Sequence, residues 1–221
     1  MSKSKIFSSD THKTLETKIK DFLNSYPSFM TEQTSSSPRA TGDAIQEILG
    51  DSLKDILGGN CSNYSSSFER RAMADLSFSD ADGFNYIVDV KTHRLSTSFS
   101  MPNLISVERL AKFYEDDKNY FILLIVQYKI VQTSITVEQV HFLPIESLDW
   151  NCLTIGALGW GQIQIKNANT ININATYSRK KWMKELCETL LKFYPKEVEK
   201  IKKRIDFFKV IKNKWEQKVD E

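Results

Sequence analysis

An aspartate and a lysine stand two residues apart in an apolar segment, at Asp89 and Lys91. Because side chains alternate between the two faces of a strand, both charges would lie on the same face. The Asp-Gly dipeptide at 82–83 is a strong signal for a tight hairpin turn just before this segment. Such a turn places the preceding alternating segment alongside and sets Asp75 opposite Asp89.

This grouping suggests phosphoryl chemistry. The two carboxylates of Asp75 and Asp89, with a backbone carbonyl such as that of Val90, are hard oxygen ligands of the kind that Mg²⁺ prefers. A lysine beside such a cation can hold a water molecule and help to deprotonate it, and both positive charges stabilise a phosphate that gains negative charge. The set suits hydrolysis of a phosphodiester. On spacing alone, a salt bridge on the exposed face of a hairpin explains the same pattern.

Length, composition and charge limit the classes of protein to which this chain can belong. The chain has 221 residues, 41% of them apolar, which is enough for a substantial core, and its net charge is +2. A net charge this close to zero does not by itself predict nucleic-acid binding. Lys and Arg are, however, concentrated in 179–218, and such a basic segment can bind a polyanion or form a solvated helix surface. Three cysteines at long spacings predict neither a disulfide framework nor a zinc site.

The hydropathy pattern predicts no membrane-spanning segment. No apolar run approaches the roughly 18 residues of a transmembrane helix, and the N-terminal segment lacks the apolar stretch of a secretory signal. We therefore expect no membrane association and a cytoplasmic location. The three histidines are not paired at ligand spacing, so histidine-based metal chemistry is not expected.

The patterning predicts an α/β fold with a central mixed β-sheet flanked by α-helices, in a single domain over 1–221. We expect N-terminal helices within 11–57, a sheet core over 70–166 and C-terminal helices within 178–218. Neither a GxGxxG fingerprint nor a Walker loop is present.

The individual elements follow from periodicity and breakers. Helices are expected at 11–30, from about Gly42 to 57, at 102–116, and on both sides of a break at Pro195. Strands are expected at 119–130, 134–145 and 161–173, and a loop at 58–67. The spacing of the apolar residues in the last helix predicts a buried face, formed by Ile201, Ile205, Phe208 and Ile211.

A longer comparison reveals a resemblance. The "MAD" that ends at Asp75 and the "DVK" of 89–91 resemble the two motifs of the PD-(D/E)XK nuclease superfamily. The stretch DVKT at 89–92, the two serines of 96–98 and the P-N-x-I-S of 102–106 are similar, at the same spacing, to the HincII branch of type II restriction endonucleases. Further similar patches lie at QIQI (162–165) and SRKKW (178–182), so the resemblance spans roughly 40–210.

The resemblance implies a restriction-endonuclease-like fold and assigns roles. Asp75, Asp89 and the Val90 carbonyl would hold Mg²⁺, and Lys91 would position the attacking water. Glu47 on the helix before the sheet would support the metal shell, or it is simply an exposed helix carboxylate.

Two segments would meet DNA. The loop of 92–103 would approach from the minor groove, and the segment 154–164 would read bases from the major groove. The implied DNA-binding residues are Thr92, Ser98, Ser100, Met101, Asn103, Gly156, Ala157 and Gln162.

This chain departs from the family pattern at two of these positions. Ser100 stands where the family carries a wedging glutamine, so Phe99 or Met101 would have to replace the wedge. Gly156 stands where the family has an asparagine, so the base contacts and the target sequence would differ. Asn103 would contact DNA or cap the next helix, as asparagine commonly does.

The activity implied is that of an Mg²⁺-dependent homodimer that cuts both strands of a palindrome in double-stranded DNA. The family implies a site of about six base pairs, blunt ends and a cognate DNA methyltransferase, and two-fold protein symmetry would match the DNA. The alternatives are a repair or recombination nuclease of the same fold, a catalytically inactive DNA-binding protein, and an α/β binding module whose Asp-Lys pair is a surface salt bridge.

Overall fold

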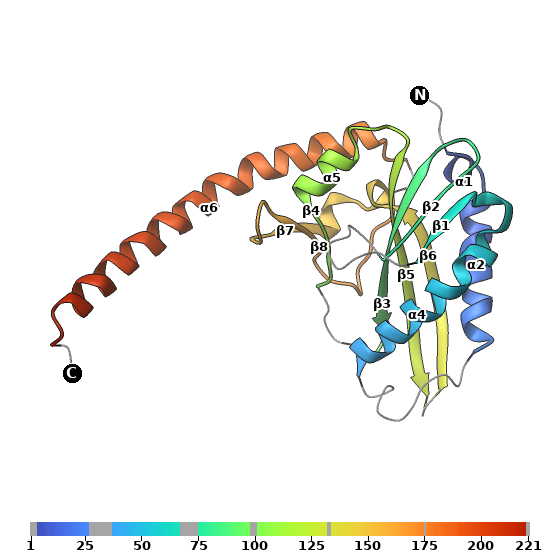
Figure 1. The fold of residues 1–221 in the computed structure, drawn as a ribbon, viewed down its shortest axis with the longest axis horizontal. Coiled ribbons are helices and arrows are strands. Elements are labelled where there is room, and N and C mark those ends of the chain that lie inside the picture. The colour runs from blue at the N-terminus through green and yellow to red at the C-terminus, as the bar shows by residue number, and fades with distance from the viewer. Residues whose placement is uncertain are drawn as a thin grey trace. The chain divides into compact units, whose positions relative to one another are not determined.

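The computed structural model describes residues 4–26, 37–66, 75–97, 101–131, 134–174 and 176–219. The chain divides into two compact units, Met1–Thr176 and Tyr177–Glu221. The first unit is an α/β structure with a mixed central sheet (Figure 1), as the patterning predicted.

The central sheet has five strands in the order β1-β2-β3-β5-β6. Strand β3 pairs with β5 in parallel, and every other neighbouring pair in this sheet is antiparallel. A parallel pair needs a long crossover connection, which the chain between β3 and β5 provides. The strands are β1 Asn63–Ser65, β2 Leu76–Ser79, β3 Asn85–Arg94, β5 Asn119–Val131 and β6 Ser134–Pro144. The predicted loop at 58–67 therefore contains a short edge strand.

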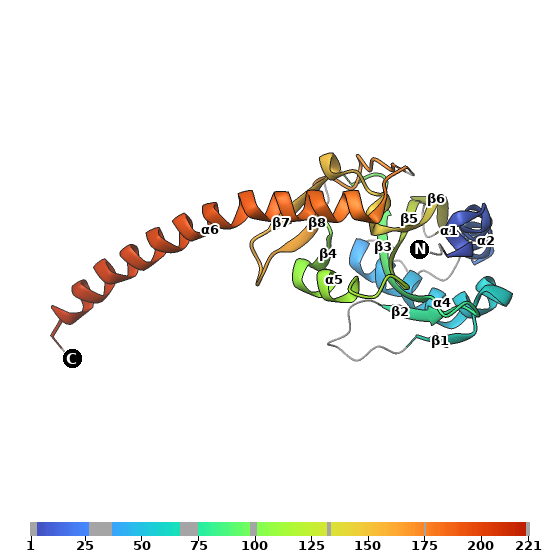
Figure 2. The same cartoon turned by 90° about the horizontal axis from the view of Figure 1, so that it is seen from above.

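Helices cover one face of this sheet (Figures 1 and 2). They are α1 Lys5–Ser8, α2 Thr11–Asn24 and α4 Pro38–Leu57. The apolar positions that recur at helical spacing in α2 and α4 are buried against alternate residues of the strands, among them Val88 and Val90. Burial of these two helical stripes fixes which face of β3 is covered by helices.

The helix limits follow from capping. Helix α2 ends at Asn24, earlier than the expected limit of 30, and α4 begins at Pro38 rather than near Gly42. Ser37 caps α4 by accepting a hydrogen bond from the Ala40 N–H, and a proline is tolerated in the first turn because its missing donor would be unpaired there.

A second, three-stranded sheet has the order β4-β8-β7 and is antiparallel. It contains β4 Asn103–Ser106, β7 Leu153–Gly156 and β8 Gln162–Ile165, and the helix α5 Val107–Phe113 follows β4 directly. The prediction of one helix over 102–116 is wrong at its start. Leu104 and Ile105 are both buried, and the segment pairs with β8 before the chain turns into α5. The expected strand at 161–173 is likewise confined to β8.

The second unit contains one helix, α6 Arg179–Glu216, capped by Ser178. The predicted break at Pro195 is wrong, because α6 continues through this residue. A proline removes one backbone hydrogen bond, and the bonds on either side of it hold the long helix together. In the described ranges, no helix combines the length and apolar character needed to cross a bilayer.

Candidate active site

The hairpin β2–β3 brings the predicted metal ligands together. Leu76 pairs with Val88, and the Asp75 N–H donates to the Val88 carbonyl at 3.0 Å, so Asp75 lies alongside the 88–90 segment that carries Asp89. Gly83 in the connecting turn has a φ of 78°, which a residue with a side chain rarely adopts. The predicted hairpin is therefore confirmed.

Asp89 and Lys91 form an ion pair on one face of β3, with Nζ and Oδ1 2.7 Å apart. The Asp89 side chain is only 8% exposed and that of Lys91 is 26% exposed. Val90, between them, points into the core on the helix side of the sheet. The alternative explanation was an ion pair on the exposed surface of a hairpin. It does not fit a carboxylate that is buried to this extent.

Burial makes the Asp89 carboxyl unusual. Its pKa is raised from 3.8 to about 7, chiefly because burial removes its hydration; Lys91 opposes this rise, and the nearby charge of Asp75 adds a smaller increase. Its Oδ2 atom is buried and accepts no hydrogen bond within the described part of the chain. A buried carboxylate oxygen without a donor, beside a second carboxylate, is an environment that a cation would stabilise.

Asp75 is held by the backbone of β3. Its Oδ2 accepts a hydrogen bond from the Val90 N–H at 2.7 Å. In an extended strand the N–H and C=O of one residue point to the same edge, so the Val90 carbonyl points towards the edge at which Asp75 lies.

The donor set at this edge is small. Among the described residues, no group of three or more His, Cys, Asp and Glu side chains is arranged to hold a metal ion. The available donors are two carboxylates and one carbonyl, which suits Mg²⁺ because this ion keeps several of its waters.

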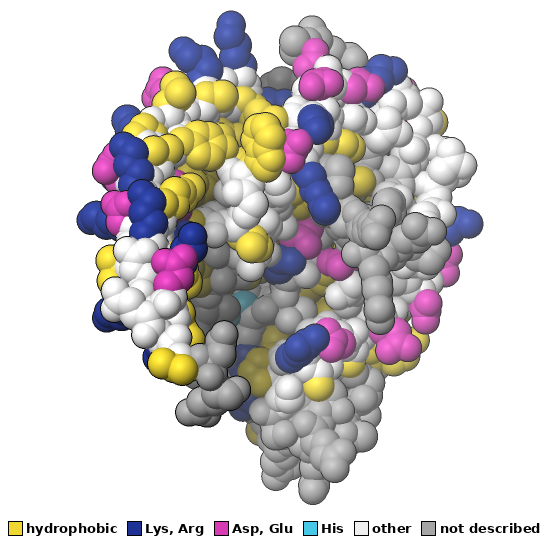
Figure 3. Space-filling model, turned by 60° about the vertical axis from the view of Figure 1, so that its left-hand side comes forward, with side chains coloured by type: hydrophobic (Ala, Val, Ile, Leu, Met, Phe, Trp, Pro, Cys, Tyr) yellow, Lys and Arg dark blue, Asp and Glu magenta, His cyan; other side chains and the backbone are white. Residues whose placement is uncertain are grey.

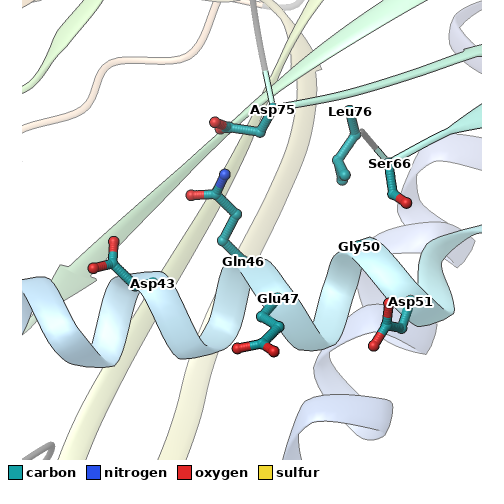
Figure 4. A pocket seen from close by; sticks show the side chains of 8 residues that line it. All are labelled: Asp43, Gln46, Glu47, Gly50, Asp51, Ser66, Asp75 and Leu76. Atoms are coloured by element: carbon teal, nitrogen blue, oxygen red, sulfur yellow. The ribbon is translucent and has the colours of Figure 1, made fainter. Parts of the chain in front are cut away.

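A pocket of about 360 Å³ opens beside Asp75, between β2 and α4. In Figure 4 the Gln46 side chain extends from α4 towards Asp75, and Asp43 lies one turn away on the same side of the helix. Glu47 also lines this pocket, but its exposed side chain points away from Asp75. Glu47 is thus close to the site but not directed at it. Gln46 was not predicted from the sequence. Its only sequence signal is its position directly after Ile45, one of the apolar residues at helical spacing.

The predicted DNA-binding loop is described only in part. Ser98, Phe99 and Ser100 lie outside the described residues, and Met101 is 43% exposed. Thr92 is half-buried, and a Cβ at Gly42 would lie 2.8 Å from the Thr92 hydroxyl oxygen. Thr92 therefore packs closely against the first part of α4.

Three other predicted DNA-binding residues meet on the small sheet. Asn103 pairs with Gln164, Gly156 pairs with Gln162, and the Gln164 amide donates to the Asn103 side-chain oxygen. A Cβ at Gly156 would lie 2.7 Å from the Gln164 side chain, so glycine leaves room for this amide.

The small sheet corrects the expected role of Asn103 and adds a residue that was not predicted. Asn103 is not a helix cap, because it begins β4 and Ser106 precedes α5. Gln164 was missed because nothing in the local sequence marks a contact between residues 61 positions apart. Ala157 is exposed in the turn after β7, where Leu158 and Trp160 also present large exposed apolar side chains.

A buried histidine ties the end of β3 to the loop that follows it. His93 is 4% exposed, and its Nε2 lies 2.8 Å from the Asn169 side-chain oxygen. The amide of Asn169 also donates to the Thr97 carbonyl at 3.2 Å. Asn169 thus fixes the start of the predicted DNA-binding loop relative to the strand that carries Asp89 and Lys91.

Comparison with known proteins adds no family. Neither the protein-family models nor the curated proteins give a match to this chain. The function must therefore be inferred from the residues and their geometry.

Proposed function

We propose that this protein is an Mg²⁺-dependent nuclease of the PD-(D/E)XK kind that hydrolyses phosphodiester bonds in double-stranded DNA. The observation that carries the proposal is the buried Asp89, with one oxygen unpaired among the described residues and the other bound to Lys91, and with the charge of Asp75 nearby. A buried carboxylate beside a second, half-buried carboxylate and one lysine is costly to keep in a fold and is typical of a functional site.

The residues of the site have separable roles. Asp75 and Asp89, with the Val90 carbonyl, would hold Mg²⁺, which would supply Lewis-acid stabilisation of the phosphate. Lys91 holds the attacking water and favours its deprotonation, since its ammonium group lies beside the Asp89 carboxylate and is partly open to solvent. The Val90 N–H fixes the orientation of the Asp75 carboxylate through the bond to Oδ2.

The finer proposal is a type II restriction endonuclease of the HincII branch that acts as a homodimer on a palindrome. The small sheet supports this because the amides of Asn103, Gln162 and Gln164 are adjacent, and amide side chains hydrogen bond to base edges. Lysines and arginines of α6 would contact phosphates and give affinity without sequence information. A cognate methyltransferase would protect the host DNA.

The test is incubation of purified protein with plasmid and phage DNA in Mg²⁺, beside Lys91→Ala. Lys112→Ala is a matched control, because Lys112 also forms a 2.7 Å ion pair, with Glu108 on an exposed helix surface. We expect discrete fragments from the wild type and from Lys112→Ala, and none from Lys91→Ala. Sequencing the fragment ends would then give the site.

Other outcomes point elsewhere. Cutting of branched DNA alone would support the repair nuclease. Binding in Ca²⁺ without cleavage in Mg²⁺ would support an inactive DNA-binding protein. Activity retained in Lys91→Ala would contradict the catalytic role of this lysine.

A further inference from the structure

Helix α6 carries an exposed stripe that is apolar except at one position. Its members recur at alternating spacings of three and four residues. We call this stripe the α6 seam, formed by Leu191, Tyr194, Val198, Ile201, Ile205, Phe208, Lys212 and Trp215. Its seven apolar side chains are 37% to 74% exposed. Figure 3 shows large hydrophobic side chains open on the molecular surface next to lysines and arginines.

The spacing is that of a coiled coil. Apolar residues with an average period of 3.5 keep one face of a helix in contact with a second, supercoiled helix. The only polar member of the seam, Lys212, is of the kind that sets register and oligomeric state in such pairs. Pro195 lies beside the seam and not within it, so its ring does not interrupt the contact line. The sequence predicted a buried face formed by Ile201, Ile205, Phe208 and Ile211. This prediction is wrong for Ile201, Ile205 and Phe208, which are 48%, 50% and 65% exposed and belong to the α6 seam.

We propose that the α6 seam pairs with the α6 seam of a second copy of this chain, in antiparallel orientation. The proposal rests on α6 alone and is independent of the proposed nuclease activity. In the preferred alignment, residues whose numbers sum to 399 face each other in the seam. Leu191 then meets Phe208, Tyr194 meets Ile205, and Val198 meets Ile201 of the second copy.

Flanking charges select this alignment. In an antiparallel pair the residues that border the seam on one side meet their equivalents in the other helix. The alignment sets Glu197 against Arg204 of the second copy and Glu188 against Lys209, each twice by symmetry. The remaining bordering pairs within α6 are Lys181 with Glu216, Pro195 with Lys202, and Leu190 with Ile211, so no like charges meet.

Other alignments are electrostatically poorer. A shift by one heptad sets Arg204 against Arg204, Lys202 against Lys202, and Glu188 against Glu216. A parallel pair in register sets Glu197 near Lys202 but Arg204 near Lys209, which combines one attraction with one repulsion. The charge pattern therefore favours one arrangement of the second copy.

The contact is also large enough for a stable dimer. Buried aromatic side chains contribute roughly 150–250 Å² each, and stable interfaces bury about 800 Å² per partner. In this alignment each copy contributes two aromatic seam side chains (Tyr194 and Phe208) and four aliphatic ones to apolar contacts, and Trp215 covers Lys184 of the second copy, which together are of this order.

The first experiment measures the mass of the full chain by sedimentation equilibrium, with Ile205→Asp and Val210→Asp as a matched pair. Ile205 lies in the seam and is 50% exposed, whereas Val210 lies on the opposite side of α6 and is 53% exposed. We expect the wild type and Val210→Asp to have twice the 25.5 kDa chain mass, and Ile205→Asp to be monomeric. A monomeric wild type at tens of micromolar, or a dimer that survives Ile205→Asp, would overturn the proposal.

The second experiment tests the orientation by charge reversal. In the antiparallel pair, Glu197→Lys and Arg204→Glu should each raise the dissociation constant roughly tenfold, and the double variant should restore it. In a parallel pair, Arg204→Glu alone would instead tighten the dimer, because it would face Lys209. Tightening by Arg204→Glu would therefore exclude the antiparallel arrangement.

Discussion

Replacement of Asp89 by asparagine should stabilise the protein above neutral pH. The Asp89 carboxyl has a pKa of about 7 in the folded chain against an ordinary value of 3.8, chiefly because it is buried. Between these two values the folded protein retains a proton that the unfolded chain has lost. Stability therefore falls as pH rises through this window, and the loss is complete above pH 7. The change in pKa corresponds to a penalty of about 4 kcal/mol at most.

The assay is urea unfolding of the wild type and Asp89→Asn at intervals from pH 4 to pH 9, without divalent cations. The free energy of unfolding of Asp89→Asn minus that of the wild type should grow with pH and level off above pH 7. Taking this difference cancels the other titrating groups. Asp55→Asn, at an exposed position of α4, serves as the control and should show no such trend.

The full stability gain of about 4 kcal/mol requires that the Lys91 ammonium group loses little stabilisation when residue 89 becomes neutral. Its side chain is 26% exposed, so the ammonium group can turn to water. A pH-independent difference, or an Asp89→Asn variant that is less stable at pH 8 than at pH 5 relative to the wild type, would refute the assignment of a buried, energetically costly carboxylate.

Three further outcomes are expected. At pH 8, millimolar Ca²⁺ should raise the melting temperature of the wild type but not of Asp89→Asn; equal shifts in calorimetry would place the cation elsewhere. Gly161→Ala should cost roughly 1–3 kcal/mol in urea unfolding, because its φ of 115° is strained for a residue with a side chain and its Cβ would lie 2.9 Å from Ile155, whereas Gly59→Ala, with open space around it, should be nearly neutral. Pro195→Ala should protect the backbone of α6 in hydrogen exchange, since it restores a helical donor and removes a penalty of up to about 3 kcal/mol; unchanged exchange would show that the proline causes no strain there.

The central hairpin could be predicted from the sequence because the information is local. Alternation places Asp89 and Lys91 on one face, and a turn at Gly83 fixes the register that brings Asp75 alongside the 88–90 segment. Helical periodicity likewise predicted that α2 and α4 bury one side against a sheet.

Long-range contacts decided the rest. The segment that begins at Asn103 has helical-looking residues, but pairing with β8, some 60 positions later, makes it a strand. Pro195 is a helix breaker in isolation, yet the bonds of the long α6 on either side carry the helix through it.

The sequence by itself determined the types and spacing of the residues that could do chemistry and the face of the strand on which they lie. Only the tertiary structure decided how deeply Asp89 is buried, that one of its oxygens has no donor among the described residues, and that Gln46 rather than Glu47 is directed at Asp75. Strand and helix periods are properties of neighbouring residues. Burial and the energy of a charge depend on which distant segments pack around it, and this was not encoded in any local pattern.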